Sequence, residues 1–221
     1  MDGSTRRRPT LNIPHVSEPS INLGDKMSLK VKSTKRYKYL PCGHAQYFDK
    51  EADGSPGECA SVHGYDREVE FTFAGEVDEH GWVVPFGELG VVKKFLEYYF
   101  DHVTVLSADD PRLDQITPEM KQPGGLLGTL RVLPYGVSME MSSLFIWEQV
   151  NAFIYRVTDG RCYVEKVQCI EHDRNSAFVE VDEKTAVKNA KLRLQQPDGA
   201  MIMKPEWDWV KPIEALQHIN S

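Results

Sequence analysis

The sequence lacks the features that would place it in a membrane, secretory or nucleic-acid-binding class. No apolar run in its 221 residues approaches the roughly 18 to 20 residues that a membrane-spanning helix needs. The N-terminus carries no apolar signal segment. The formal net charge is -7, and we interpret the basic segments 6–8 and 30–38 as a solvated tail and an exposed strand face. We therefore expect a cytoplasmic protein that does not enter a membrane or bind nucleic acid.

Cysteines are also few and widely spaced. The sequence has four, at positions Cys42, Cys59, Cys162 and Cys169. They form neither a Cys-x-x-Cys pair nor a dense framework, which is typical of reduced thiols rather than disulfides. A zinc site in this chain would therefore depend on histidines and their neighbours.

The remaining composition is that of one globular domain with tails, with 41% hydrophobic and 27% charged residues. Residues 1–26 are rich in proline and small polar residues, and we expect them to form an N-terminal arm. We expect residues 27–182 to form the folded domain and residues 183–221 a C-terminal extension. Two tryptophans, Trp207 and Trp209, are expected to pack this extension onto the domain.

Hydrophobic periodicity predicts strands and helices in two similar units. Alternating apolar residues predict one long strand or two short ones from residue 29 to 39, in a segment that ends at 41–44. They also predict strands at 69–74, 82–84, 130–133, 162–171 and 176–181. Apolar residues at helical spacing predict helices at 88–100, from Ser138 to a cap at Asp159-Gly160, and at 186–194. The segment 82–84 is expected to pair back on the preceding strand as a hairpin. Most of 107–134 should be an irregular connection.

Reactive side chains gather where these predicted elements begin or end. The segment Cys59–Tyr65 places a thiol and an imidazole directly before a strand, where a sheet can hold them rigidly. His44 follows the first strand, and Asp101-His102 ends the first helix. Glu171 ends an otherwise apolar row of a late strand, so it should serve a ligand or an ion pair. Each residue alone is more often structural, and only the combination predicts an active site.

In this order the motifs resemble the 6-pyruvoyl-tetrahydropterin synthase and 6-carboxy-tetrahydropterin synthase family. The resemblance spans about residues 37–181 and rests on His44, Cys59-x3-His63-Gly64, the turn from Gly75 to Trp82, Asp101-His102 and Glu171. It implies an α+β tunnelling fold, in which two antiparallel strand pairs, each with a helix, join in one sheet with the helices on one face. It also implies a homo-hexamer of two stacked trimers, in which subunits close a β-barrel with the helices outside and share active sites. Open sheet edges favour such association.

The resemblance implies a zinc site with one altered ligand. Family members hold Zn²⁺ through three histidines, and His44 and His63 match two of them. The third position is Tyr65, which would have to ligate as a phenolate. Glu58 or Asp66 would be the alternative oxygen donors, and a weak or absent metal is the third possibility.

The resemblance also implies the roles of the other residues. Cys59 matches the proton-abstracting thiol, whose pKa would have to fall in a positive field. Asp101 and His102 match the acid-base pair. Glu171 matches the carboxylate that binds the pterin ring. Glu140 lies where a second pterin-binding carboxylate usually stands, although an acid in the first turn of a helix is an equal interpretation.

The implied reaction converts 7,8-dihydroneopterin triphosphate to 6-carboxy-5,6,7,8-tetrahydropterin, a step towards queuosine-type 7-deazaguanine nucleosides. The short Cys-x3-His spacing resembles the carboxy-forming members more than the animal pyruvoyl-forming ones. Synthesis of 6-pyruvoyl-tetrahydropterin is the alternative reaction. A non-catalytic oligomeric pterin-binding protein is the alternative of another class.

Overall fold

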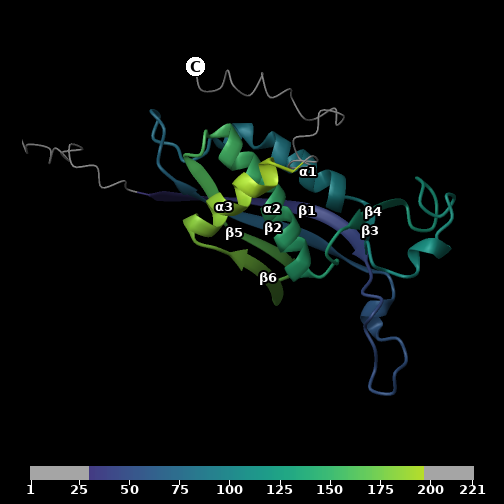
Figure 1. The fold of residues 1–221 in the computed structure, drawn as a ribbon. Coiled ribbons are helices and arrows are strands. Elements are labelled where there is room, and N and C mark those ends of the chain that lie inside the picture. Colours follow the sequence, from purple (N-terminus) through teal and green to yellow (C-terminus); the bar gives the residue numbers. More distant parts are fainter. Residues whose placement is uncertain (1–29, 197–221) are drawn as a thin grey trace, which may run out of the picture.

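A curled six-stranded sheet organises residues 30–196, the part of the chain that this computed structural model describes (Figure 1). The strands lie in the order β4-β3-β1-β2-β5-β6. Their bounds are β1 Val31–His44, β2 His63–Gly75, β3 Val103–Ser107, β4 Thr129–Leu133, β5 Cys162–His172 and β6 Asn175–Glu180. Helices α1 (Gly90–Phe100), α2 (Met139–Val157) and α3 (Glu183–Leu194) lie over one face of this sheet (Figure 1).

The long antiparallel pair β1 and β2 forms the centre of the sheet. Its register runs from Val31 opposite Gly75 to His44 opposite His63, so two histidines meet where the pair ends. An irregularity between Tyr37 and Leu40 interrupts the pairing. Beyond it the strand continues to His44, so this segment forms one 14-residue strand, which was one of the two predictions, and not two short strands.

The apolar stripes of α1 and α2 bury the inner face of the sheet as their periodicity predicts. Phe95 and Leu96 of α1 are fully buried, as is Phe71 of β2. Helix α2 begins at the predicted place because the Ser138 hydroxyl accepts a hydrogen bond from the backbone N–H of Met141 at 3.3 Å. This packing fixes the positions of the strand ends that carry the candidate site.

Two predictions about the middle of the chain were wrong or incomplete. Residues 82–84 form no strand, because the Asp78 carboxylate accepts hydrogen bonds from the backbone of His80 and Trp82 and folds the segment into a turn. Strand β3, which the sequence analysis did not identify, instead lies parallel to both β1 and β4. All five of its residues are buried, including the polar Thr104 and Ser107, so the strand does not show the apolar-polar alternation of a half-exposed strand.

Helix α3 confirms the helix predicted at 186–194 and begins three residues earlier. Its Ala186 and Ala190 are fully buried, and the Asn151 side chain of α2 donates a hydrogen bond to the Ala186 carbonyl at 2.8 Å. The predicted N-terminal arm, Trp207 and Trp209 lie outside the described residues, so the predicted domain boundaries stay predictions. None of the helices within residues 30–196 is long and apolar enough to cross a membrane.

Candidate active site

The candidate site begins with the histidine pair where β1 and β2 end. The rings of His44 and His63 have centroids 4.4 Å apart. His63 Nδ1 donates to the Ser61 carbonyl at 2.8 Å, which leaves its Nε2 as the acceptor nitrogen. His44 is buried, and its Nδ1 has no hydrogen-bond partner among the described residues. Burial, then the charges of Arg67 and His63, lower the pKa of His44 to about 3, so it is a neutral imidazole.

Tyr65 stands beside this pair in the position that the sequence analysis singled out. Its ring centroid lies 5.9 Å from that of His63 and 6.2 Å from that of His44. A fourth ring, that of His172 at the end of β5, lies 5.7 Å from Tyr65. The sequence analysis missed His172, although its place directly after Glu171 was a signal for it. Both nitrogens of His172 are engaged, Nδ1 by the backbone N–H of Arg174 and Nε2 by the Asn175 side chain.

Arg67 adds an unexpected buried charge two residues after Tyr65. The residue is 1% exposed, and its guanidinium lies over the Phe100 ring at 4.9 Å. One nitrogen donates to the Ser142 hydroxyl at 2.9 Å, whereas Nε and Nη2 have no acceptor within residues 30–196. A fixed cation near His44 opposes the binding of a second cation there, since like charges repel strongly in a low-dielectric interior.

The thiol of Cys59 lies in a single 3-10 turn, Glu58–Ala60, on the loop between β1 and β2. Its backbone N–H donates to the Asp49 carboxylate at 3.0 Å, and its carbonyl accepts from Gln46 at 2.7 Å. Burial, then the negative charges of Asp49, Glu171 and Glu58, raise the pKa of Cys59. The surroundings within one chain therefore do not lower this pKa, and a thiolate needs a positive charge from elsewhere.

The predicted acid-base pair is formed. His102 Nδ1 donates to the Asp101 carboxylate at 2.6 Å, which leaves Nε2 free, and the His102 side chain is 84% exposed. The backbone of His102 has a positive φ of 53°, a conformation that is uncommon outside glycine and that often marks a functional residue. His102 lines an open groove with Tyr65 and Asp66. No hydrogen bond or ion pair among the described residues joins this pair to Cys59.

The two candidate pterin carboxylates differ in their surroundings. Glu171 lies at the end of β5, where Asn175 donates to it at 3.4 Å and the His172 ring nitrogen is 3.7 Å away. Its side chain is 17% exposed, and its charge reaches Cys59. Glu140 is exposed in the first turn of α2, and no contact within residues 30–196 brings it to the other candidates. The geometry therefore favours the helix-dipole interpretation of Glu140.

Comparison with known families identifies the family of this chain. The family model described as 6-pyruvoyl tetrahydropterin synthase matches residues 33–182, which is more than half of the chain. The chain belongs to the 6-pyruvoyl tetrahydropterin synthase family. No curated protein sequence matches it. The matched range includes every candidate site residue and ends where α3 is about to begin.

Solved structures confirm the tunnelling fold expected of this family. An uncharacterized protein from Wolinella succinogenes is 18% identical, with a TM-score of 0.58, over 70% of this chain and 100% of that chain. A catalytic-residue mutant of the Plasmodium vivax 6-pyruvoyltetrahydropterin synthase is also 18% identical, with a TM-score of 0.53, over 70% of this chain and 99% of that chain. At this identity the structures establish the fold alone.

Family members commonly use a metal ion, and the residues present fit one only in part. His44 and His63 are adjacent imidazoles, and imidazole nitrogens are ligands that zinc accepts. No group of three His, Cys, Asp or Glu side chains within residues 30–196 is arranged to hold a metal. Tyr65, the residue predicted as the third ligand, presents a phenol beside the two histidines. The donor set therefore offers two good ligands and lacks an ordinary third.

Replacing Arg67 with methionine is expected to leave the free energy of unfolding unchanged or to raise it by about 1 to 4 kcal/mol. Methionine fills similar space without two unpartnered donors, and the Ser142 hydroxyl keeps its bond to the Val137 carbonyl. Urea denaturation measures the change. Arg67→Ala is the control, because removing the buried stem should destabilise by about 2 to 5 kcal/mol. A loss of more than about 2 kcal/mol in Arg67→Met would mean that the guanidinium has acceptors such as buried water.

The raised pKa of Cys59 gives a pH prediction for metal-free protein. A raised thiol pKa means less thiolate at a given pH, so the alkylation rate should reach its midpoint above the ordinary range for cysteine. Cys59 is the one exposed cysteine within residues 30–196, so iodoacetamide reports on it. Asp49→Asn and Glu171→Gln should each lower this midpoint. A midpoint below that of a free thiol would show that the chain itself supplies the positive field.

Proposed function

We propose that the chain is a lyase that converts 7,8-dihydroneopterin triphosphate to 6-carboxy-5,6,7,8-tetrahydropterin for 7-deazaguanine (queuosine-type) biosynthesis in the cytoplasm. The observation that carries this proposal is the hydrogen bond between Asp101 and His102. The same chain places Glu171 close enough to Cys59 for its charge to raise the pKa of the thiol. An acid-base pair, a thiol and a pterin-binding carboxylate are the groups that this reaction requires. The short Cys-x3-His spacing favours the carboxy product.

Each of these side chains has a defined task in the proposed reaction. Glu171 would accept hydrogen bonds from the 2-amino group and ring N–H of the pterin, which fixes the ring relative to Cys59. Cys59 would remove a proton from the substrate side chain. His102 would accept a proton at Nε2 and return it, because the proton on Nδ1 is held in the hydrogen bond to the Asp101 carboxylate. Zinc held by His44 and His63 would polarise the side-chain hydroxyls of the substrate.

The proposal includes assembly into a hexamer with active sites between subunits. The described sheet ends in two open edges, β4 and β6, which is the arrangement that favours association. The His102 ring is exposed, and no hydrogen bond or ion pair within residues 30–196 joins the Asp101–His102 pair to Cys59. A pair and a thiol from neighbouring subunits would then complete one site.

A non-catalytic pterin-binding protein is the second candidate, and two observations favour it. The third ligand position is Tyr65, and the buried charge of Arg67 opposes a cation at His44. Such a protein would keep the Glu171 anchor without turnover. Synthesis of 6-pyruvoyl-tetrahydropterin uses the same groups and differs in its product.

Turnover in defined zinc separates these candidates. Protein freed of metal and then supplied with excess zinc is expected to consume 7,8-dihydroneopterin triphosphate, and His44→Ala and His63→Ala are expected to lose both bound zinc and consumption. Protein that binds a pterin but consumes no substrate at any zinc concentration would refute the enzyme and favour the binding protein.

A further inference from the structure

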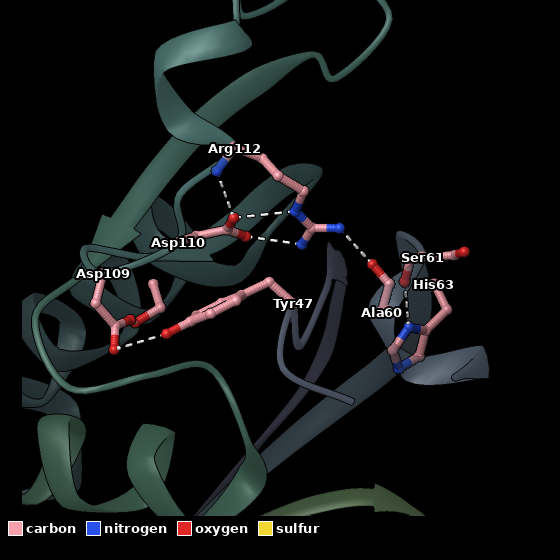
Figure 2. Close-up of polar contacts among 8 residues, drawn as sticks. Tyr47, Ala60, Ser61, His63, Asp109, Asp110 and Arg112 are labelled. Carbon is pink, nitrogen blue, oxygen red and sulfur yellow. Dashed lines mark hydrogen bonds and ion pairs between the residues drawn. The ribbon is translucent and has the colours of Figure 1, made fainter. Parts of the chain in front are cut away.

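One guanidinium connects the turn that carries Cys59 to the segment that follows β3 (Figure 2). Arg112 donates to the Asp110 carboxylate from Nε at 3.0 Å and from Nη2 at 2.7 Å, and its backbone N–H donates to the same carboxylate at 2.9 Å. Its remaining nitrogen, Nη1, donates to the Ala60 carbonyl at 2.6 Å. Ala60 directly follows Cys59 and is buried.

The Asp110 end of this contact is a fixed ionic anchor. The Asp110 side chain is 0% exposed, whereas that of Arg112 is 38% exposed. Burial raises the pKa of Asp110, but the hydrogen bonds and charge of Arg112 outweigh it and the pKa is lowered. The carboxylate therefore stays ionised at neutral pH. A bidentate contact of this kind also fixes the orientation of the guanidinium.

A second contact from the same segment reaches the other side of the Cys59 loop. Tyr47, three residues after the end of β1, donates its hydroxyl to the Asp109 carboxylate at 3.3 Å (Figure 2). The Ser107 hydroxyl donates to the same carboxylate. Asp109 and Arg112, which both follow β3, therefore hold the loop between β1 and β2 near its two ends. Figure 1 shows that the β1–β2 loop and the segment between β3 and β4 project from the same end of the sheet.

These contacts link the two halves of the candidate site. Strand β3 begins directly after Asp101-His102, and Asp110 follows three residues after β3 ends. The Ala60 carbonyl stands between Cys59 and the Ser61 carbonyl that accepts from His63. A displacement of Ala60 would therefore move the thiol and the imidazole together, relative to β3.

We propose that Arg112 is a positioning residue that, held by Asp110, sets the place of the Cys59–His63 segment relative to β3. The catalytic part of this statement rests on the proposed function, because it takes Cys59 as the base. The positional part stands on the contacts alone. A misplacement of about 1 Å at a catalytic group can cost about 100-fold in rate, so such a contact has a large effect on turnover.

The test compares Arg112→Met with a matched variant at the other end of the sheet. Arg161 also donates to backbone carbonyls, those of Glu76 and Trp82, and also fastens a loop. The readouts are the iodoacetamide rate of Cys59, its pH midpoint, and kcat and KM. In Arg112→Met we expect the alkylation rate to rise at least about threefold, and kcat to fall at least about tenfold with KM within about threefold. Arg161→Met should change none of these readouts.

Two further results decide the proposal. Arg112→Lys keeps the charge but cannot bind Asp110 and Ala60 at the same time, so its alkylation rate and kcat should lie between those of wild type and Arg112→Met. This variant replaces Arg112→Met if Arg112→Met does not fold. Unchanged Cys59 alkylation in both Arg112 variants would overturn the proposal, as would equal changes in Arg161→Met at a similar loss of Tm. Because alkylation needs no turnover, it gives its answer even if the protein consumes no pterin.

Discussion

Turnover of 7,8-dihydroneopterin triphosphate falls by about 10² to 10⁴-fold when His102 is replaced by asparagine, the range expected for loss of a general acid-base group. Asparagine is the appropriate replacement because it tolerates the positive φ of 53° at this position better than other residues. The exposed ring contributes little to packing, so Tm should stay nearly constant. Steady-state kinetics would show the loss in kcat.

The control for this variant is another exposed histidine next to an acid. His80 Nε2 lies 3.6 Å from the Glu79 carboxylate, and its side chain is 63% exposed. His80→Asn should leave kcat within about twofold, since surface substitutions away from a site have small effects. Asp101→Asn should approach the loss of His102→Asn, because it replaces the charged carboxylate that fixes the ring with a neutral amide. Turnover within threefold of wild type in His102→Asn would exclude this pair as the acid-base group.

Pterin affinity falls by about 10 to 100-fold in Glu171→Gln, since a hydrogen bond to a charged group contributes about 1.5 to 3 kcal/mol. The carboxylate can accept two N–H bonds from the pterin, whereas an amide offers one acceptor and presents a donor where the pterin also donates. Fluorescence titration with neopterin measures the dissociation constant without turnover. The Asn175 contact is long at 3.4 Å, so its loss should change stability little.

Glu140→Gln is the matched variant for this measurement. Glu140 is exposed in the first turn of α2 and does not contact Glu171. The dissociation constant of the Glu140→Gln variant for neopterin should therefore stay within about twofold of the wild-type value. An equal loss of affinity in both variants would make Glu140 a pterin ligand contributed across a subunit boundary. Unchanged affinity in Glu171→Gln would remove the anchor from the proposed function.

Local pattern was sufficient to predict most elements and the residues that the family motif names. The alternation at Val69, Phe71 and Phe73 is a direct consequence of one buried sheet face, and helix α2 begins at its predicted cap. The parallel pairing of β3 was not predictable in this way, because its partners lie far away in the sequence and its residues are all buried.

The residues that the sequence analysis missed have roles that depend on tertiary contacts. Arg67 occupies an ordinary inward position of a strand, and nothing in the chain marks it as a buried cation. Arg112 lies in an irregular segment, and its partner Ala60 is 52 residues away. His172 meets Tyr65 only because β5 pairs with β2. Such groupings follow from strand order and register, which periodicity does not encode.

The most direct test of the proposed function is the mass of the product formed from 7,8-dihydroneopterin triphosphate by zinc-supplied protein. We predict 6-carboxy-5,6,7,8-tetrahydropterin, and its loss in Cys59→Ala. The mass of 6-pyruvoyl-tetrahydropterin would contradict the carboxy assignment while keeping the lyase. Unchanged substrate, with neopterin still bound, would contradict catalysis by this chain.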